Sequence, residues 1–346
     1  MRRKLLMLCV ALLTVVITFA QDSKPYTVVF YNLENLFDIY DDPETHDEEF
    51  TPEGVKQWNE SKYQRKLANM ERVLFDIAAI QREYPIVIGV SEIENRTVLE
   101  DLVSQPSLAG ANYRICHFDS PDARGVDCAF LYRADVFHLE GSDNIRLEVP
   151  GQPDFRTRDL VTMWGTIDGE PFYFLVSHWP SRLGGKEVSQ YKRDACATQI
   201  RAIKDAVLAA NPDTKVIVMG DFNDDATDDS IVEVMGAKGR IRDLEPGDFF
   251  NPYNQMLRAG LGTLAYQDAW NLFDNICVTE NLVNADEGEL RLVRGEGMRY
   301  WGNIFSRPYM IQQEGQYKGY PLRTFVTNNF QNGFSDHFPV YIYIGR

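Results

Sequence analysis

Short runs of β-branched and aromatic residues recur along the chain between turns rich in Gly, Pro, Asn and Asp. This pattern is typical of many short strands. A run over 26–31 and another over 86–90 each end on polar residues. Runs of the same kind predict the remaining strands, at 113–117, 127–132, 160–167, 172–177, 215–219, 275–279 and 338–344.

Two longer segments repeat their apolar residues at helical spacing. Between Leu67 and Ile77 an apolar residue recurs every three or four positions, which predicts an amphipathic helix over 62–81. A second helix is predicted over 187–208. Many strands and few helices in mixed order predict an α/β fold, a four-layer sandwich of two mixed β-sheets packed face to face with helices outside. No repeat or low-complexity linker interrupts the pattern, so a single domain over 21–346 is the simplest organisation.

The amino terminus has the form of a secretory signal peptide. Three cations at positions 2–4 precede an apolar run over 5–19, and polar residues follow Ala20. The alternatives are a retained membrane anchor and a lipoprotein signal. The run is shorter than the roughly 20 apolar residues of a spanning helix, and Cys9 lies inside it, where a lipid attachment site is badly placed. We therefore expect cleavage of residues 1–20, export to a periplasm or the medium, and no stable membrane anchor.

The composition adds an acidic balance, with a formal net charge of −16 and a pI of about 4.8. Such a chain repels polyanions at long range, which excludes tight nonspecific coating of nucleic acid. Cleavage of nucleic acid is not excluded, because a divalent cation and a local basic patch invert the field inside one cleft.

Four cysteines remain after the expected cleavage: Cys116, Cys128, Cys196 and Cys277. An exported protein can form disulfides, but these four are widely spaced and lie in apolar contexts. Buried free thiols are the favoured expectation. If one disulfide exists, Cys116 and Cys128 are the favoured pair, because they flank a predicted turn.

Polar side chains stand where several predicted strands end, which is where α/β folds place their ligands. This mixture of carboxylate, amide and imidazole at five strand ends is uncommon: Asn32, Glu92, His178, Asp221 with Asn223, and Asp336 with His337. The carboxylates offer the oxygen ligands that Mg²⁺ prefers, and the amides can bind phosphate oxygens. A protein-caged Zn²⁺ is disfavoured, because only two histidines are well placed and the sequence has no cysteine cluster.

Each of these residues, taken singly, also has an ordinary structural explanation. A lone strand-end carboxylate such as Glu92 is more often a surface or capping group, and a lone histidine is more often structural. Asp221 could simply cap a helix suggested near 228–235. The ordered set favours function over these explanations.

Several other charged residues have two readings. Glu34 and Glu94 each lie two residues from a candidate site residue. Each could either support that residue or be the functional residue in its place. Asp127 is a candidate for orienting His178. The acid-rich segment over 38–60 is either a cation site or, more simply, a solvated loop. Four cations are either ordinary surface groups or contacts for substrate phosphate: Arg156, Arg158, Arg182 and Lys186.

Six segments, in order, resemble the endonuclease/exonuclease/phosphatase superfamily, which includes pancreatic-type deoxyribonuclease, abasic-site endonucleases, neutral sphingomyelinases and inositol polyphosphate phosphatases. The segments span positions 31–340, nearly all of the expected mature chain. They are Tyr31-Asn32-Leu33-Glu34-Asn35, Val90-Ser91-Glu92, Ser177-His178-Trp179, Met219-Gly220-Asp221-Phe222-Asn223, Phe273-Asp274-Asn275-Ile276 and Ser335-Asp336-His337-Phe338-Pro339-Val340. The chain departs from the family pattern around 262–270, where relatives often have more aromatic residues and a glycine in place of Asp268.

The resemblance implies a metal site and a water-activating pair. Glu92 would be the principal Mg²⁺ ligand, with Mn²⁺ or Ca²⁺ as alternative ions. Asn32 beside it would contact phosphate or metal-bound water, and Asp336 would lie near the metal. His337, paired with Asp274, would form the base side of in-line attack by water.

The remaining roles follow from the same resemblance. Asp221 would position or activate the nucleophile, and Asn223 would bind a phosphate oxygen. His178 would bind the phosphate or assist the leaving oxygen. Arg182 stands in a stretch similar to the His-x-x-Ser-Lys/Arg segment of bacterial extracellular nucleases, which makes it a candidate phosphate clamp.

Together with the amino terminus, which indicates export, these roles predict an exported, Mg²⁺-dependent phosphodiesterase that acts as a nuclease on DNA or RNA. The first alternative is a phospholipase C or phosphatase acting on sphingomyelin or inositol phosphates, and the second is a binding module without catalysis. Nucleic acid is the expected partner, as substrate. A monomer without a protein partner is the expected state.

Overall fold

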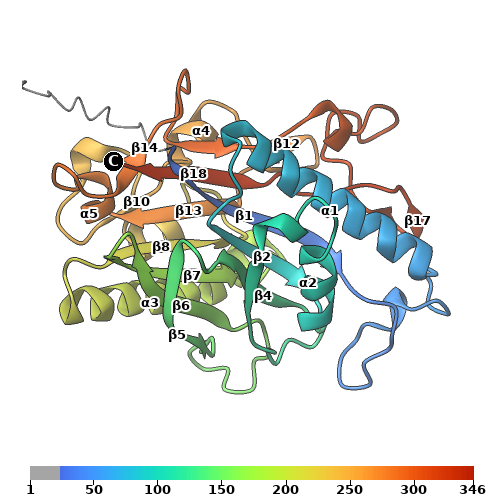
Figure 1. Cartoon of the computed structure of the whole chain (residues 1–346). Helices are drawn as coiled ribbons and strands as arrows, with labels where there is room; N and C mark the ends of the chain where they lie inside the picture. Colours follow the sequence, from blue (N-terminus) through green and yellow to red (C-terminus); the bar gives the residue numbers. More distant parts are fainter. Residues whose placement is uncertain (1–23) are drawn as a thin grey trace, which may run out of the picture.

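The structure is a computed structural model that describes residues 24–346 (Figure 1). The expected signal peptide over 1–20 lies outside the described residues. Within residues 24–346, no helix combines the length and apolar character needed to cross a bilayer.

Most strands belong to two seven-stranded sheets. The first sheet contains β1 (Tyr26–Leu36), β2 (Val87–Ile93), β3 (Tyr113–His117), β4 (Asp127–Arg133), β14 (Arg291–Val293), β15 (Gly302–Ile304) and β18 (Val340–Gly345). The second sheet contains β5 (Phe137–Ile145), β6 (Leu160–Ile167), β7 (Glu170–His178), β8 (Lys215–Asp221), β9 (Ala237–Lys238), β10 (Phe249–Phe250) and β13 (Asp274–Thr279). Two separate hairpins are formed by β11 (Leu264–Tyr266) with β12 (Ala269–Asn271), and by β16 (Phe325–Val326) with β17 (Asn329–Phe330).

Both sheets mix parallel and antiparallel pairs. The first runs in the order β14-β18-β1-β2-β4-β3, with β15 also pairing to β18, and the second runs β5-β6-β7-β8-β13-β10-β9. At their centres, β1 is parallel to β2 and β7 is parallel to β8, whereas β18 and β13 join them antiparallel. In each sheet the two parallel strands end at the same edge. The polar residues at the ends of these strands therefore lie near one another.

The alternation of side chains along β1 explains how the layers stack. Val28 and Phe30 pack into the core between the two sheets, whereas Val29 and Tyr31 pack against the outer helices. On the far side, Cys196 of the longest helix packs on the outer face of the second sheet. The helices are α1 (Glu60–Gln81), α2 (Arg96–Val103), α3 (Lys186–Ala210), α4 (Asn254–Arg258) and α5 (Glu280–Val283).

The predicted four-layer sandwich is confirmed: α1 and α2, the first sheet, the second sheet and α3 follow one another (Figure 1). The helix predicted over 62–81 begins at Glu60, because Asn59 caps it by accepting a hydrogen bond from the Lys62 N–H. The last strand begins at Val340 instead of 338, because Pro339 has no N–H and the Phe338 N–H bonds to Thr263.

Some elements were not predicted, because their sequences lack strong periodicity. β5 is an edge strand whose central residues are largely exposed, so it carries no apolar run. α2 has only eight residues. The segment near 228–235 forms a short π-helix, Ser230–Val234, instead of a regular helix.

The expectation of buried free thiols is confirmed. Cys116, Cys128, Cys196 and Cys277 are all free and buried. Cys116 and Cys128 lie on the neighbouring strands β3 and β4 and pack into the core between the sheets, where they act as small apolar groups.

Candidate active site

Three site residues lie in a row at the ends of neighbouring strands in the second sheet. The register pairs His178 of β7 with Asp221 of β8, and Asp221 with Asp274 of β13. The strands pack closely beneath this row, because a Cβ on Gly220 would lie 2.0 Å from the Ser177 carbonyl oxygen. Backbone pairing alone therefore brings together an imidazole and two carboxylates that are far apart in the sequence.

The first sheet contributes Asn32 and Glu92 to the same site. Asn32 pairs with Ser91, and the register of β1 and β2 then shifts. Glu92 lies at this irregularity with a φ of 57°, a left-handed conformation that non-glycine residues seldom adopt. The Asn35 N–H donates to Glu92 Oε2 at 3.1 Å and anchors the carboxylate. Such strained backbone is concentrated at functional sites, so the conformation supports a functional role for Glu92.

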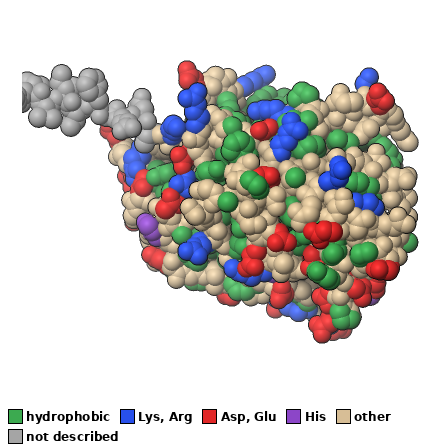
Figure 2. Space-filling model, turned by 45° about the vertical axis from the view of Figure 1, so that its right-hand side comes forward, with side chains coloured by type: hydrophobic (Ala, Val, Ile, Leu, Met, Phe, Trp, Pro, Cys, Tyr) green, Lys and Arg blue, Asp and Glu red, His purple; other side chains and the backbone are tan. Residues whose placement is uncertain are grey.

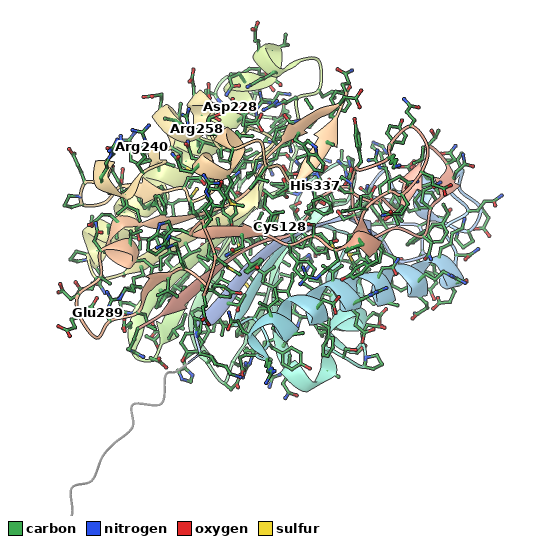
Figure 3. All side chains as sticks on the ribbon, turned by 90° about the horizontal axis from the view of Figure 1, so that it is seen from above. Cys128, Asp228, Arg240, Arg258, Glu289 and His337 are labelled. Carbon is green, nitrogen blue, oxygen red and sulfur yellow. The ribbon has the colours of Figure 1, made fainter. Side chains whose placement is uncertain are left out.

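His337, just before β18, lies near the middle of the molecule in the view of Figure 3. Its ring contacts the row of the second sheet. Its Nδ1 is 2.8 Å from Asp274 Oδ2, and its Nε2 is 3.7 Å from Asp221 Oδ2. The Ser335 hydroxyl donates to the Asn32 carbonyl at 2.7 Å and accepts from the His337 N–H at 3.1 Å. The structure thus places His337 against the partner that the sequence assigned to it, and fixes the backbone on both sides.

The two histidines of the site have opposite pKa shifts. Burial by itself lowers the pKa of His337, but the carboxylates of Asp274 and Asp221 outweigh it and hold that pKa well above its usual range. Burial, with the nearby guanidinium of Arg158, holds the pKa of His178 well below its usual range. Neighbouring groups whose pKa values are driven apart are typical of acid–base sites.

Asp221 is held at both of its carboxylate oxygens. Asn32 Nδ2 donates to Oδ2 at 3.0 Å, and the Asn223 backbone N–H donates to Oδ1 at 2.9 Å. Asn223 itself has a φ of 50°, and its side-chain amide donates to the Trp179 carbonyl at 2.9 Å. Burial is the main reason why the pKa of Asp221 rises to about 6. His178 Nε2 lies 3.6 Å from Asp221 Oδ2.

The carboxylates differ in their access to a cation. The Glu92 and Asp336 side chains are 14% and 31% exposed, whereas Asp221 and Asp274 are 3% and 0% exposed. A hard cation that keeps water ligands fits the accessible pair better. Among the described residues, Asp221, Asp274 and His337 also have potential ligand atoms within 4.8 Å of one another. The hydrogen bond between His337 and Asp274 accounts for part of that closeness.

A buried ion pair beneath the site was missed by sequence reasoning. Lys66 of α1 is 1% exposed, lies 4.0 Å from Glu34 Oε2 and donates to Thr324 Oγ1 at 2.7 Å. Glu34 also accepts from the Thr324 N–H at 2.6 Å and lies 3.3 Å from Arg323. Burial and the nearby Asp336 raise the pKa of Glu34 to about 7. The sequence held one signal, since Lys66 stands on the apolar face of the predicted helix.

Two cations on the rim of the site were also missed. Arg124 is 49% exposed, donates to Asn35 Oδ1 at 2.7 Å and lies 3.8 Å from Glu92 Oε2. Arg323 is 45% exposed and pairs with Asp336 at 2.6 Å. Neither stands in a strand-end motif, so only the tertiary structure reveals their position.

Arg182, expected to bind phosphate, is engaged inside the protein. Its Nη2 lies 2.8 Å from Asp228 and 3.2 Å from Asp224, and its Nε donates to the Asn223 carbonyl at 2.8 Å. Lys186 pairs with Asp228 at 2.7 Å. These contacts neutralise Arg182 and give it a second role, which is to hold the loop that carries Asn223.

The other two candidate phosphate cations do not face the substrate side of the site in the same way, since one is buried behind His178 and the other lies in a separate pocket. Arg158 is buried, pairing with Asp122 at 3.0 Å and donating to the Trp179 carbonyl at 2.9 Å, so it supports the strand that carries His178. Arg156 is exposed and lines an acidic pocket of about 490 Å³ with Glu94. Figure 2 shows carboxylates gathered towards the lower part of one face. Burial raises the pKa of Glu94 to about 8, and its Oε2 accepts from the Asp38 N–H at 2.6 Å, which makes it a support for the acidic loop.

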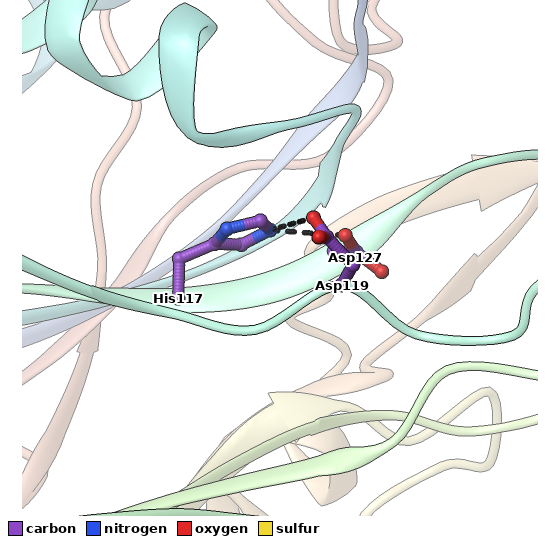
Figure 4. A group of neighbouring side chains, drawn as sticks. All are labelled: His117, Asp119 and Asp127. Carbon is purple, nitrogen blue, oxygen red and sulfur yellow. Dashed lines mark hydrogen bonds and ion pairs between the residues drawn. The ribbon is translucent and has the colours of Figure 1, made fainter. Parts of the chain in front are cut away.

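The suggestion that Asp127 orients His178 is wrong. Asp127 Oδ2 lies 2.9 Å from His117 Nε2 (Figure 4). Its Oδ1 accepts from the Ser120 N–H at 2.9 Å. The two carboxylate oxygens are therefore used elsewhere. His178 Nδ1 is buried and has no hydrogen-bond partner among the described residues.

The comparisons with known proteins agree with this fold. Residues 27–346 match the model of the Endonuclease/Exonuclease/phosphatase family. No curated protein sequence matches the chain.

Several solved structures share the fold. A humanized D. rerio TDP2 is 15% identical, with a TM-score of 0.55 over 94% of this chain and 100% of that one. A mannosyl-6-phosphatase of Bacteroides thetaiotaomicron is 18% identical, with a TM-score of 0.54 over 92% and 99%. The human Nocturnin catalytic domain is 16% identical, with a TM-score of 0.51 over 93% and 94%. The chain belongs to the endonuclease/exonuclease/phosphatase family, whose members are metal-dependent phosphoesterases and nucleases.

Proposed function

We propose that the protein is an exported, Mg²⁺-dependent nuclease that hydrolyses phosphodiester bonds of DNA or RNA by in-line attack of water. The observation that carries the proposal is Asp221, which is fixed at both oxygens and lies between His337 Nε2 at 3.7 Å and His178 Nε2 at 3.6 Å. A carboxylate and two imidazoles held this close can orient water and bind a phosphoryl group.

The residues present fit a hard cation. Glu92 would be the principal ligand, with Asn32 and Asp336 beside it, because these residues offer oxygens and Glu92 and Asp336 are partly exposed. When bound, Mg²⁺ supplies positive charge to the phosphate oxygens.

The protein side chains would then have separate roles in hydrolysis of the phosphodiester. Asp221 accepts a hydrogen bond from the attacking water and orients it. His337, held by Asp274, presents Nε2 to the same water, 3.7 Å from Asp221 Oδ2. His178 donates a hydrogen bond to the phosphate, and its low pKa keeps it neutral at neutral pH.

The nucleic acid would bind to the site next to the two cations at the rim of the site. Arg124 and Arg323 are both about half exposed and flank the carboxylates, so each can contact a phosphate next to the scissile one. One similar structure is that of D. rerio TDP2 in complex with a single-strand DNA product.

Hydrolysis of a small phosphate ester, by a phosphatase or phospholipase C reaction, is the second candidate. The observation in its favour is the engagement of the rim cations with carboxylates in a strongly acidic chain. Such a surface attracts long polyanions weakly. The mannosyl-6-phosphatase among the similar structures shows that the fold accommodates a phosphatase.

A substrate panel separates the two candidates. Mature protein is incubated with plasmid DNA, RNA, sphingomyelin, inositol polyphosphates and a sugar phosphate, with Mg²⁺ or with a chelator. His337→Ala is expected to lower turnover by roughly 100-fold or more, and His138→Ala, on the exposed side of β5, serves as the matched control. Release from a lipid or sugar phosphate without cleavage of nucleic acid would favour the second candidate. Amino-terminal sequencing of the secreted protein tests export, with a first residue near Gln21 expected.

A further inference from the structure

A pocket of about 360 Å³ opens beside Asp336, between the β11–β12 hairpin and the segment over 312–323. This size is at the lower end of the range for small-ligand sites. The pocket shares Asp336 and Arg323 with the candidate active site, so a ligand in it would be a neighbour of the reacting phosphate. Its lining includes Tyr266, Gln267, Gln312, Tyr317, Tyr320 and Asp336.

A chain of aromatic rings connects the pocket to the residue that follows His337. Phe338, the residue after His337, stacks on Trp270 with ring centroids 6.1 Å apart. Trp270 is 6.5 Å from Tyr320, which is 5.8 Å from Tyr317. Tyr266 on the hairpin is 67% exposed and Trp270 is 39% exposed, so neither ring is needed to fill the core. Exposed aromatic rings gathered beside a catalytic site are suited to stacking against a planar ligand.

The charges of the pocket specify which part of a substrate it takes. Among the described residues that line the pocket, Arg323 is the only cation. It is already paired with Asp336 and Glu34. Asp268 is occupied by the Tyr320 hydroxyl at 2.7 Å. The remaining polar side chains of the lining are uncharged: the amides of glutamine and the hydroxyls of tyrosine. A phosphate would find one cation here, Arg323, which two carboxylates already neutralise, whereas an uncharged ring with hydrogen-bonding edges would find stacking surfaces, hydroxyls and amides.

We propose that this pocket binds one unpaired nucleobase of the substrate, adjacent to the scissile phosphate. The inference rests on the proposed nuclease function and adds a preference for single-stranded nucleic acid. A base in a duplex could enter the pocket only after leaving its stack, which costs a few kcal/mol per base. The aromatic surface accepts every base, so little sequence preference is expected.

The test compares the double variant Tyr266→Ala/Tyr317→Ala with the wild type and with Tyr40→Ala. Tyr40 is 74% exposed and lies outside this pocket, so it controls for the loss of a surface tyrosine. The substrates are a single-stranded oligonucleotide, the same sequence as a duplex, and the same strand with abasic residues. The wild type is expected to cut the single strand with the lowest KM. The double variant should raise that KM roughly 5- to 100-fold, with a nearly unchanged kcat and no change on the abasic strand.

The outcomes separate the inference from the function on which it rests. The pocket assignment alone would be overturned if the double variant kept the KM of the wild type. It would also be overturned if KM rose equally on abasic and base-containing strands. A wild type that cuts no nucleic acid but hydrolyses bis(p-nitrophenyl) phosphate would overturn the nuclease proposal and the base-binding pocket with it. Circular dichroism spectra of the variants establish that each is folded.

Discussion

His337 Nδ1 lies 2.8 Å from Asp274 Oδ2, and both side chains are buried. The two residues come from different sheets, since Asp274 opens β13 and His337 precedes β18. Their hydrogen bond fixes which nitrogen of His337 faces Asp221 and the substrate. A carboxylate in this position also stabilises the protonated form of the imidazole.

Replacing Asp274 by asparagine should keep the shape of the site but remove that stabilisation. We expect kcat to fall by roughly 10²- to 10⁴-fold with little change in KM. The pKa of His337, followed by NMR in metal-free protein, should fall, because Asp274 is the nearest carboxylate that raises it. Asp243→Asn, on the surface, is the control. An unchanged kcat would remove Asp274 from the mechanism.

A separate prediction concerns the contribution of Lys66 to the free energy of unfolding. Lys66→Met keeps the length of the side chain but leaves the buried Glu34 carboxylate without its ammonium partner. The free energy of unfolding in urea should fall by about 3 kcal/mol, as is typical when one partner of a buried ion pair is removed. Lys62→Met, one turn earlier and half-buried, is the control. Equal stability of Lys66→Met and the wild type would show that the pair contributes nothing net.

Arg182 can be tested for its two possible roles. If it holds the loop of Asn223, Arg182→Gln should lower kcat and reduce stability by about 1–3 kcal/mol, because Asp224, Asp225 and Asp228 then each lose one of the cations that contact them. A direct phosphate clamp would instead raise KM at a constant kcat. Steady-state kinetics beside Lys186→Gln, which shares the Asp228 partner, distinguish the two.

The four thiols should be unreactive in the folded protein. Burial raises the pKa of Cys116, Cys128, Cys196 and Cys277, so the reactive thiolate is scarce and inaccessible. Ellman's reagent should label none of them in native mature protein within minutes, and all four after unfolding in guanidinium without reductant. Only two reactive thiols after unfolding would indicate a disulfide.

The sequence predicted the layers, and it singled out most of the residues that the structure brings together at the candidate site, because both depend on local pattern. Buried strands appear as apolar runs, and a polar residue such as Asp221 at the end of a run marks a sheet edge. It could not predict the irregularity that turns Glu92 into a left-handed conformation, since no glycine or proline marks it. Nor could it pair Arg182 with Asp228, because that contact joins a loop to a segment brought near only by the parallel pairing of β7 and β8.

The limits of local reasoning also explain the error at Asp127. Its position at the start of a strand made it resemble the other site residues. The antiparallel pairing of β3 with β4 instead brings His117 beside it. The order of the strands thus determines which imidazole lies next to a carboxylate such as Asp127.

The central claim is that metal-dependent phosphodiester hydrolysis takes place where Glu92, Asp221 and His337 meet. Initial rates of single-strand cleavage across a Mg²⁺ titration, for wild type and Glu92→Gln, test it most directly, with Glu100→Gln on the surface of α2 as control. We expect no cleavage in chelator, restoration by Mg²⁺, and a Mg²⁺ requirement at least tenfold higher in Glu92→Gln, since even the groups that support a metal ligand typically contribute 10- to 100-fold to metal affinity or activity. Cleavage that persists in chelator, or an unchanged Mg²⁺ dependence in Glu92→Gln, would contradict it.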